Sequence, residues 1–206
     1  DEALESQIYQ PHNIEKICAW GGFASVKHVT KYIQPGIELI SLDPKRSASI
    51  IGPEALEDDE AIEETARRLA CDFSVGNQTA CASARMVYVM CGTEDEDIEK
   101  LKTLGQKAYD AMFDLPEVLT TKPKRYDPDL KSSVDSLRFS EDFYTVIGGE
   151  AGEGAVIVSH TSDRVDFWEY LGDRTVNLIP VDTLEEVLDV VDAYTQTVGI
   201  WPESLR

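Results

Sequence analysis

The stretch KICAWGGFASVKHVTKYIQPGIELISL, residues 16–42, constrains the fold of this chain most strongly. Its apolar and polar residues alternate in a way that predicts a strand, a helix ended by Pro35, and a second strand, over residues 16–19, 24–33 and 37–42. Two strands joined through a helix are typical of a parallel sheet, because parallel strands need a long crossover connection. The chain is therefore expected to fold around a parallel sheet.

The same alternation of strands and helices continues along the chain. A helix that begins at Pro53 carries acidic residues in its first turn and apolar residues at three- and four-residue spacing, and it runs to about Phe73. Further helices are expected over 95–113 and 184–191, and further strands over 48–51, 86–91, 144–147, 155–159, 176–181 and 197–201. Pro116–Phe139 is proline-rich and weakly periodic, and we interpret it as a surface excursion. The pattern predicts an α/β fold with a mainly parallel sheet flanked by helices.

Composition excludes several classes of function. The formal net charge of −20 repels phosphate backbones and anionic lipids, which argues against nucleic-acid and membrane partners. No apolar run approaches the roughly 18 residues of a membrane helix, and DEALESQIYQ at the N-terminus does not read as a signal peptide. With 42% hydrophobic and 28% charged residues, the chain has the composition of an ordinary globular protein. We expect it to act in the cytoplasm.

The four cysteines, Cys18, Cys71, Cys81 and Cys91, form no CxxC pair, and none of the three histidines lies near a cysteine in sequence. This spacing favours a reduced compartment and gives no support to a metal site. Cysteine usually behaves as a small buried hydrophobe, and we expect this of Cys18, Cys71 and Cys91.

Cys81 differs from the other cysteines because NQTACAS surrounds it with small and polar residues, between a predicted helix and a predicted strand. It fills space, holds a metal or acts as a nucleophile, and the pattern alone leaves these readings open. Loops on rigid scaffolds often hold reactive groups, and a thiolate is favoured by nearby cations and donated backbone N–H groups.

Other candidates are weaker. Gly21 and Gly22 follow a predicted strand and allow backbone N–H groups to approach a phosphate, but they also suit a plain tight turn and are not the GxGxxG fingerprint. His28 and His160 are possible general bases without a recognisable partner, so a structural role is favoured for both.

NQTACASARMVYV, residues 77–89, resembles the nucleophile segment of the aldehyde dehydrogenase superfamily, in which Asn and Gln precede the catalytic cysteine and a Ser-Arg stretch leads into a strand. Residues 41–73 resemble the segment upstream of that cysteine. AWGGFASVKHV and IPVDTLEEVLDVVDAYTQTVGI are similar to the acyl-reductase branch typified by LuxC, the fatty-acid reductase of bacterial bioluminescence operons. The resemblance covers Ile14 to Pro202, although Pro116 to Asp173 matches no pattern of the family.

The resemblance implies a mechanism. The thiolate of Cys81 attacks a fatty acyl thioester, carried by coenzyme A or an acyl-carrier protein, and NADPH then reduces the acyl-enzyme to an aldehyde. The backbone N–H of Cys81 helps to hold the oxyanion, and Gly21 and Gly22 align with the turn near the dinucleotide. Lys45, Arg46 and the cluster 122–125 are candidates for the phosphate groups. Self-association, or association with an acyl-transferring enzyme, is also implied.

The same resemblance divides the chain. Residues 1–40 correspond to the end of a cofactor-binding domain and residues 41–206 to the cysteine-bearing catalytic domain, so we expect most of the cofactor domain to lie outside these residues. We therefore expect that the 206 residues alone do not complete the reduction.

Two positions depart from the pattern of the superfamily. Ser41 stands where hydrolytic aldehyde dehydrogenases carry a water-activating glutamate, which suits transfer of the acyl group to hydride rather than to water, and Asp43 is a possible displaced base. Gln78 lies three residues before Cys81, where the usual spacing is two and Thr79 stands.

Two rival functions stay open at this point. In the first, Cys81 passes an acyl group to water or an amine, which a histidine within hydrogen-bond reach would favour. In the second, the chain is an assembly module in which Cys81 is inert, which a fully buried Cys81 without an adjacent pocket would favour.

Overall fold

The computed structural model describes residues 2–42 and 45–205, and the chain divides into two compact units, Asp1–Lys45 and Arg46–Arg206. The boundary lies a few residues after the division that the sequence suggested between residues 40 and 41. None of the helices in the described residues is both long and apolar enough to span a membrane.

The smaller unit contains the strand, helix and strand that the sequence predicts. β1 (Lys16–Trp20) and β2 (Glu38–Leu42) pair in parallel, and α2 (Phe23–Val29) with a short 3₁₀ turn connects them. An additional helix, α1 (Glu2–Ile8), precedes them and was not predicted. The Glu5 carboxylate of α1 accepts a hydrogen bond from the Tyr32 hydroxyl at 2.7 Å and lies 2.6 Å from Nε2 of His28, which joins α1 to the second half of the crossover.

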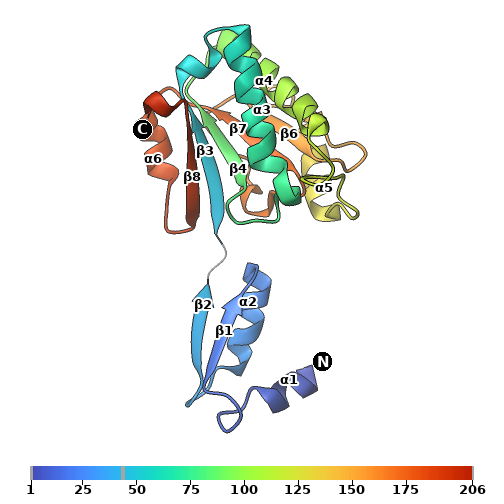
Figure 1. The fold of residues 1–206 in the computed structure, drawn as a ribbon, viewed down its shortest axis with the longest axis vertical. Helices are drawn as coiled ribbons and strands as arrows, with labels where there is room; N and C mark the ends of the chain where they lie inside the picture. Colours follow the sequence, from blue (N-terminus) through green and yellow to red (C-terminus); the bar gives the residue numbers. More distant parts are fainter. Residues whose placement is uncertain (1, 43–44, 206) are drawn as a thin grey trace. The chain divides into compact units, whose positions relative to one another are not determined.

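The larger unit contains a six-stranded sheet in the order β5-β6-β7-β4-β3-β8 (Figure 1). All neighbouring strands are parallel except the pair β5–β6, so the expectation of a mainly parallel sheet is confirmed. The strands are β3 (Arg46–Ile51), β4 (Ala84–Val89), β5 (Tyr144–Gly148), β6 (Ala155–Ser159), β7 (Thr175–Pro180) and β8 (Thr195–Trp201).

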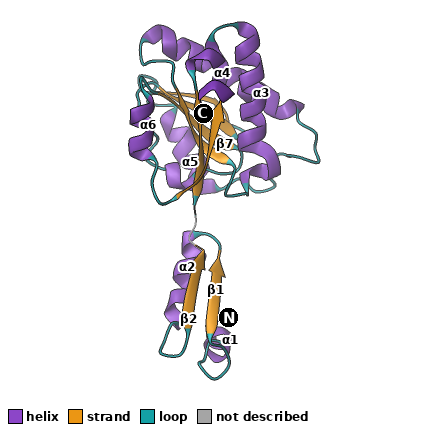
Figure 2. Cartoon of the chain, turned by 60° about the vertical axis from the view of Figure 1, so that its left-hand side comes forward, coloured by secondary structure: helices purple, strands orange, loops and turns teal. Residues whose placement is uncertain are grey.

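Helices cover both faces of this sheet (Figure 2). The core on one face is formed with α3 (Asp59–Ser74) and α4 (Asp95–Asp114), and the core on the other with α5 (Pro128–Leu137) and α6 (Leu184–Val190). Because side chains alternate along a strand, Val87 and Val89 of β4 join the first core, and Met86 and Tyr88 join the second. A parallel sheet buried on both faces explains the nearly continuous apolar runs of its central strands.

α3 leads into the loop of residues 75–83, which carries Cys81 and is called the cysteine loop below. Its first turn is capped by Asp58, whose carboxylate accepts a hydrogen bond from the Ala61 N–H at 2.8 Å. The apolar positions that the sequence pattern singled out are buried against the sheet, among them Ile62, Ala66 and Leu69. Pro53 begins a separate 3₁₀ turn, Pro53–Leu56, rather than α3 itself.

One expectation was wrong. The segment Pro116–Phe139 is not only a surface excursion, because it contains α5, whose Leu130 and Val134 are buried in the second core. The helix begins with a side-chain cap, since Asp127 accepts hydrogen bonds from the N–H groups of residues 129 and 130, and Pro128 occupies the first turn.

Candidate active site

Cys81 lies in the short loop between α3 and β4, at the amino edge of the parallel sheet, and it is exposed. The chain turns sharply on the way to it. Gly76, Asn77 and Gln78 have φ angles of 62°, 54° and 59°, a left-handed conformation that residues other than glycine rarely adopt. Two consecutive non-glycine residues of this kind require support from the surrounding structure.

The amide of Gln78 supplies part of this support. The side chain is 1% exposed, and its Nε2 donates hydrogen bonds to the carbonyls of Ala84 at 2.7 Å and Thr175 at 3.0 Å. Its Oε1 accepts a hydrogen bond from the Thr175 N–H at 3.0 Å. The Gln78 amide therefore supplies the hydrogen bonds that link the amino ends of β4 and β7, where the strands are not yet paired through their backbones. It fixes the loop to both strands.

Asn77 holds the outer side of the turn. Its Oδ1 accepts hydrogen bonds from the Thr121 N–H at 2.9 Å and the Thr120 hydroxyl at 3.1 Å. The N–H of Gly76 donates to the Leu119 carbonyl at 2.7 Å. The loop is thus fastened to the segment between α4 and α5.

Arg85 is a residue of the site that the sequence analysis did not identify. Its guanidinium is inserted beneath the loop and donates hydrogen bonds to four backbone carbonyls, those of Leu171 at 2.8 Å, Ser83 and Gln78 at 3.1 Å, and Ala80 at 3.5 Å. Burial, with a smaller contribution from the charge of Arg46, lowers the pKa of Arg85 to about 10, and interaction with Cys81 opposes this shift. An arginine inside the otherwise apolar stretch 84–89 was the signal that sequence reasoning passed over.

Arg46 lies at the start of β3 and approaches the same edge of the sheet. Its Nε and Nη2 donate to the Glu169 carbonyl at 3.0 and 2.6 Å, and burial lowers its pKa. The candidate phosphate ligand is therefore engaged, in part, with the loop before β7. Of the other suggested cations, Lys45 is half-buried just before β3, and Lys122, Lys124 and Arg125 are exposed between α4 and α5.

Two pockets adjoin the cysteine loop. The first, of about 1010 Å³, is lined by the loop residues Ala80, Ala82 and Ser83 and by side chains of α3, β3 and β8, including Ile51, Leu69, Asp72 and Trp201. The second, of about 760 Å³, is lined by residues 77–79 of the same loop, by α5, and by Phe167 and Tyr170. Both volumes are in the range of ligand-binding clefts.

The remaining cysteines do not all behave as expected. Cys18 and Cys71 are exposed, so the expectation that they are buried core residues was wrong. Cys18 lies on the face of β1 opposite the buried Ile17 and Ala19, and Cys71 faces the first pocket. Cys91 is half-buried just after β4, and burial raises its pKa to about 12, which makes it a poor nucleophile.

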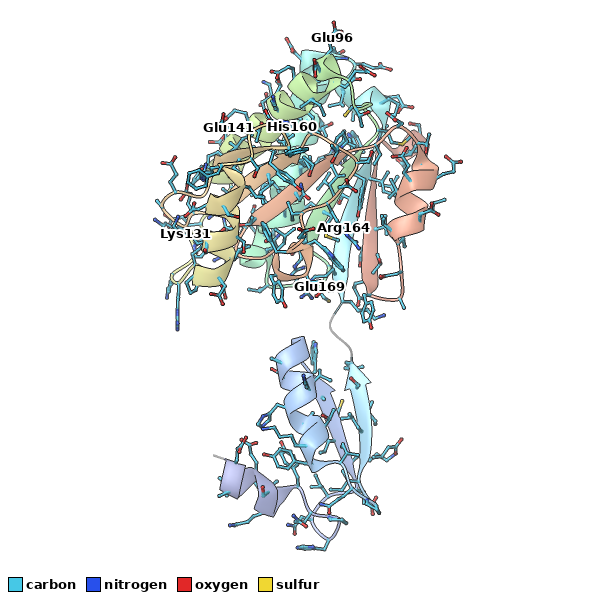
Figure 3. The ribbon with its side chains drawn as sticks, turned by 180° about the vertical axis from the view of Figure 1, so that it is seen from behind. Glu96, Lys131, Glu141, His160, Arg164 and Glu169 are labelled. Carbon is cyan, nitrogen blue, oxygen red and sulfur yellow. The ribbon has the colours of Figure 1, made fainter. Side chains whose placement is uncertain are left out.

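His160 lies at the opposite edge of the sheet from the cysteine loop. His160 follows β6 and is therefore at the carboxyl edge of the sheet, whereas Cys81 precedes β4 and is at the amino edge. Its ring nitrogens contact the Thr145 hydroxyl at 2.9 Å and the Asp142 carbonyl at 3.2 Å. Figure 3 shows His160 and Glu169 at different ends of the larger unit, consistent with this separation. His28 belongs to the smaller unit and contacts Glu5.

The glycines proposed for a cofactor lie in the smaller unit. Gly22 caps α2, and a Cβ added there would meet no atom within 4 Å, so the turn leaves open space beside its backbone. At Gly21 a Cβ would approach the Cβ of Ser25 to 3.2 Å. Of the two residues discussed in place of the glutamate, Ser41 lies at the end of β2, whereas Asp43 falls outside the described residues. In the described part of the chain, no group of three or more His, Cys, Asp or Glu is arranged to hold a metal ion.

The chain is similar in sequence to two long-chain acyl-protein thioester reductases. The long-chain acyl-protein thioester reductase of Aliivibrio fischeri is 27% identical over 204 residues, a match that covers 98% of this chain and 39% of that protein. The long-chain acyl-protein thioester reductase of Vibrio harveyi is 23% identical over 210 residues, covering 96% and 41%. The chain thus spans about two fifths of the length of these relatives.

Solved structures show the fold. An NADP-dependent glyceraldehyde-3-phosphate dehydrogenase from Bacillus halodurans superposes with a TM-score of 0.64 at 12% identity, covering 97% of this chain and 46% of that one. An NAD-dependent aldehyde dehydrogenase from Sinorhizobium meliloti gives 0.65 at 15% identity, covering 96% and 41%. The fold is therefore that of the aldehyde dehydrogenases, as the resemblance of residues 41–89 implied.

A match to the family described as "Acyl-CoA reductase (LuxC)" extends over residues 1–206, and the resemblance of AWGGFASVKHV and IPVDTLEEVLDVVDAYTQTVGI to this family agrees with it. The chain belongs to the LuxC family of acyl-CoA reductases.

Proposed function

We propose that this chain is the cysteine-bearing catalytic part of a reductase that converts a fatty acyl thioester to an aldehyde through an acyl group bound to Cys81. The observation that carries the proposal is that the Cys81 thiol is exposed on a loop whose backbone is held by buried side chains. Other residues of the same loop line two pockets. An exposed nucleophile on a fixed support meets the geometric requirement of covalent catalysis.

In the first half-reaction the Cys81 thiolate adds to the thioester carbonyl, and the donor thiol leaves as the acyl-cysteine forms. The oxyanion of the intermediate is held in part by the backbone N–H of Cys81. Arg85 and Arg46 contribute positive charge near the loop of a chain that is otherwise strongly acidic, which favours the anionic species of this step.

The first pocket suits the acyl chain. Ile51, Leu69, Val75 and Trp201 contribute apolar surface to it, and Trp201 is covered by the guanidinium of Arg68, 3.9 Å from the ring centroid. An acyl chain that enters this pocket is withdrawn from water while its carbonyl stays near the loop. The names of the relatives support a long-chain acyl group bound to a protein, and fatty acyl-CoA and an acyl-carrier protein are the donors we propose.

In the second half-reaction Cys81 would be released as its thiolate when the aldehyde departs, and a nicotinamide cofactor, which we propose to be NADPH, would supply the hydride when bound. Gly21 and Gly22 fit such a cofactor because their turn carries no side chain, and they would hold its phosphates. The second pocket gives a second reactant access to the loop. A cytoplasmic location and self-association, or association with an acyl-transferring enzyme, complete the proposal.

Two rival functions are less well supported. Transfer of the acyl group to water or an amine calls for a base beside the thiol, and His160 lies at the opposite edge of the sheet, where it contacts Thr145 and Asp142. An inert assembly module is disfavoured by the exposure of Cys81 and by the pocket beside it.

The test compares the full-length protein with the 206-residue chain, each incubated with a long-chain acyl-CoA and NADPH. We expect aldehyde from the full-length protein, none from its Cys81→Ser variant, and none from the 206 residues alone. Aldehyde formation by the full-length Cys81→Ser variant at the wild-type rate would refute the proposal.

A further inference from the structure

We infer that Ser47 is a positioning residue for Cys81, and that together with the Ser49–Asp72 pair it fastens the cysteine loop to β3. The inference rests on the proposed function, because it assigns a role in acyl transfer to side chains that hold the cysteine loop rather than to the thiol itself. It concerns the direction in which the thiol points rather than its reactivity.

The main contact is a hydrogen bond from the Ser47 hydroxyl to the backbone carbonyl of Cys81, with an Oγ to O distance of 2.6 Å. Ser47 is 1% exposed, so water does not compete effectively for the bond. The bond holds the peptide plane that follows Cys81, and Arg85 Nη1, 3.5 Å from the Ala80 carbonyl, contacts the plane that precedes it. With both planes held, the Cα–Cβ bond of Cys81 has little freedom to change direction.

A local irregularity of the sheet brings Ser47 to this position. The register of β3 shifts between Ser47 and Ala48 against β4, and between Arg46 and Ala48 against β8. On the β4 side Ser47 lies opposite Ala84 and Ala48 lies opposite Met86, so Arg85 is an extra residue without a partner in β3. Irregularities of this kind re-aim side chains and occur preferentially near active sites. Here one irregularity accompanies the approach of both Ser47 and Arg85 to the cysteine loop.

A second fastening lies two residues further along β3. The hydroxyl of Ser49, which is 3% exposed, donates to the Asp72 carboxylate, and the same carboxylate accepts a hydrogen bond from the Ala84 N–H at the end of the loop. Asp72 is near the C-terminal end of α3, where the helix dipole disfavours a negative charge, and burial raises its pKa. The two hydrogen bonds oppose these effects, but the pKa of Asp72 stays above its ordinary value.

The neighbouring strand β8 leaves room for the Ser49–Asp72 pair. Gly199 of β8 faces it, and a Cβ added at that position would lie 2.8 Å from Oγ of Ser49 and 3.6 Å from Oδ2 of Asp72. The absence of a side chain at Gly199 therefore leaves the space that the pair occupies. Asp72 and Ser49 also line the first pocket, next to the loop residues Ala80 and Ala82.

A purely structural role for Ser47 is the alternative, and the two roles differ in what they change. Loss of a structural hydroxyl lowers stability but leaves acyl transfer by the folded molecules unchanged. Loss of a positioning contact slows acyl transfer at saturating donor without weakening donor binding, because the donor does not touch Ser47.

The test uses full-length protein and follows acylation of Cys81 by long-chain acyl-CoA with intact mass measured over time. We expect Ser47→Ala to lower the maximal rate about tenfold, which corresponds to about 1.4 kcal/mol, with an unchanged half-saturating donor concentration. Ser47→Thr keeps the hydroxyl and is expected to restore most of the rate. Ser74→Ala is the control, because this buried hydroxyl binds the Ala70 carbonyl within α3.

Two further measurements separate the possible causes. Iodoacetamide alkylates an exposed thiol with little demand on direction, so its rate with Cys81 is expected to be the same in Ser47→Ala and the wild type. Asp72→Asn tests the second fastening, and we expect acylation at saturating donor to slow about threefold. Should Ser47→Ala not fold, the comparison of Asp72→Asn with the wild type still decides whether the fastening matters.

Acylation of Ser47→Ala and Asp72→Asn within twofold of the wild type would overturn the inference while leaving the proposed function intact. If the wild-type protein itself forms no adduct at Cys81, the proposed function fails and the inference fails with it.

Discussion

Replacement of Arg85 by methionine tests how much this buried cation contributes to the stability of the fold and to the acylation of Cys81. Arg85 is 8% exposed, and three of its hydrogen bonds to backbone carbonyls are 2.8–3.1 Å long. Hydrogen bonds from a charged donor contribute about 1.5 kcal/mol or more each, so their loss costs about 4–5 kcal/mol. Methionine keeps much of the apolar stem and removes the charge.

A second effect opposes this loss. Burial is the main reason that the pKa of Arg85 falls from 12.5 to about 10, and this shift corresponds to about 3 kcal/mol of unfavourable free energy for the charged form in the folded state. Because the charge disappears in Arg85→Met, this penalty disappears as well. The unfolding free energy is therefore expected to fall by only about 1–2 kcal/mol.

The effect on the site is expected to be larger. Arg85 contacts the carbonyls of Gln78, Ala80 and Ser83, which lie on both sides of Cys81. Without these contacts the loop loses its fixed path, and misplacement of a reacting group by about 1 Å slows a reaction by up to about 100-fold. We expect Arg85→Met to slow acylation of Cys81 at least tenfold.

The assay combines denaturant unfolding with the rate of Cys81 acylation, measured by intact mass. Arg138→Met is a matched control, because Arg138 also donates to backbone carbonyls, those of Val146 and Gly148, but far along the chain from the loop. Its acylation rate is expected to equal that of the wild type. Wild-type acylation by Arg85→Met, or a loss of unfolding free energy above about 5 kcal/mol, would show that the reasoning is wrong.

Three other substitutions test parts of the same account. Gln78→Met removes three buried hydrogen bonds, so the unfolding free energy is expected to fall by about 3 kcal/mol and acylation to slow, and unchanged denaturant unfolding would contradict this. Gly199→Ala brings a Cβ to 2.8 Å from Oγ of Ser49, so unfolding is expected to become easier by about 1–3 kcal/mol, whereas an alanine variant as stable as the wild type would show that the pair has room to move. Hydrogen bonds from His28 and Tyr32 lower the pKa of Glu5 from 4.5 to about 2, so the contribution of Glu5 to stability is present above pH 4.5 and is lost as the pH falls towards 2. In Glu5→Gln the Tyr32 ring resonances are expected to stay unchanged as the pH falls from 4.5 towards 2. An acid transition equal to that of the wild type would exclude Glu5 as the origin of the transition.

Much of the fold follows from local pattern. The strands and helices that form the parallel sheet are visible in the sequence because apolar residues recur at regular spacing, as they do in α3 and in β4. α5 was missed because proline and polar residues dominate its beginning, although Asp127 followed by Pro128 is also a signal for the start of a helix. Pro128 was interpreted as a loop residue where it is a first-turn residue.

The supports of the cysteine were less predictable. The sequence indicated that Cys81 stands in a loop, and the structure places it there. Ser47 contacts a carbonyl 34 residues away through a register shift that no local pattern reveals, and Gln78 reaches Thr175, 97 residues away. The exposure of Cys18 was also beyond local reasoning, because a strand residue is buried only if another element covers its face.

The most direct test of the central claim is the mass of the intact full-length protein after incubation with a long-chain acyl-CoA, for the wild type, Cys81→Ser and Cys91→Ser. We predict a single acyl adduct in the wild type and in Cys91→Ser, because burial raises the pKa of Cys91 to about 12, and none in Cys81→Ser. An adduct that persists in Cys81→Ser, or no adduct in any of the three proteins, would contradict the assignment of Cys81 as the residue that carries the acyl group.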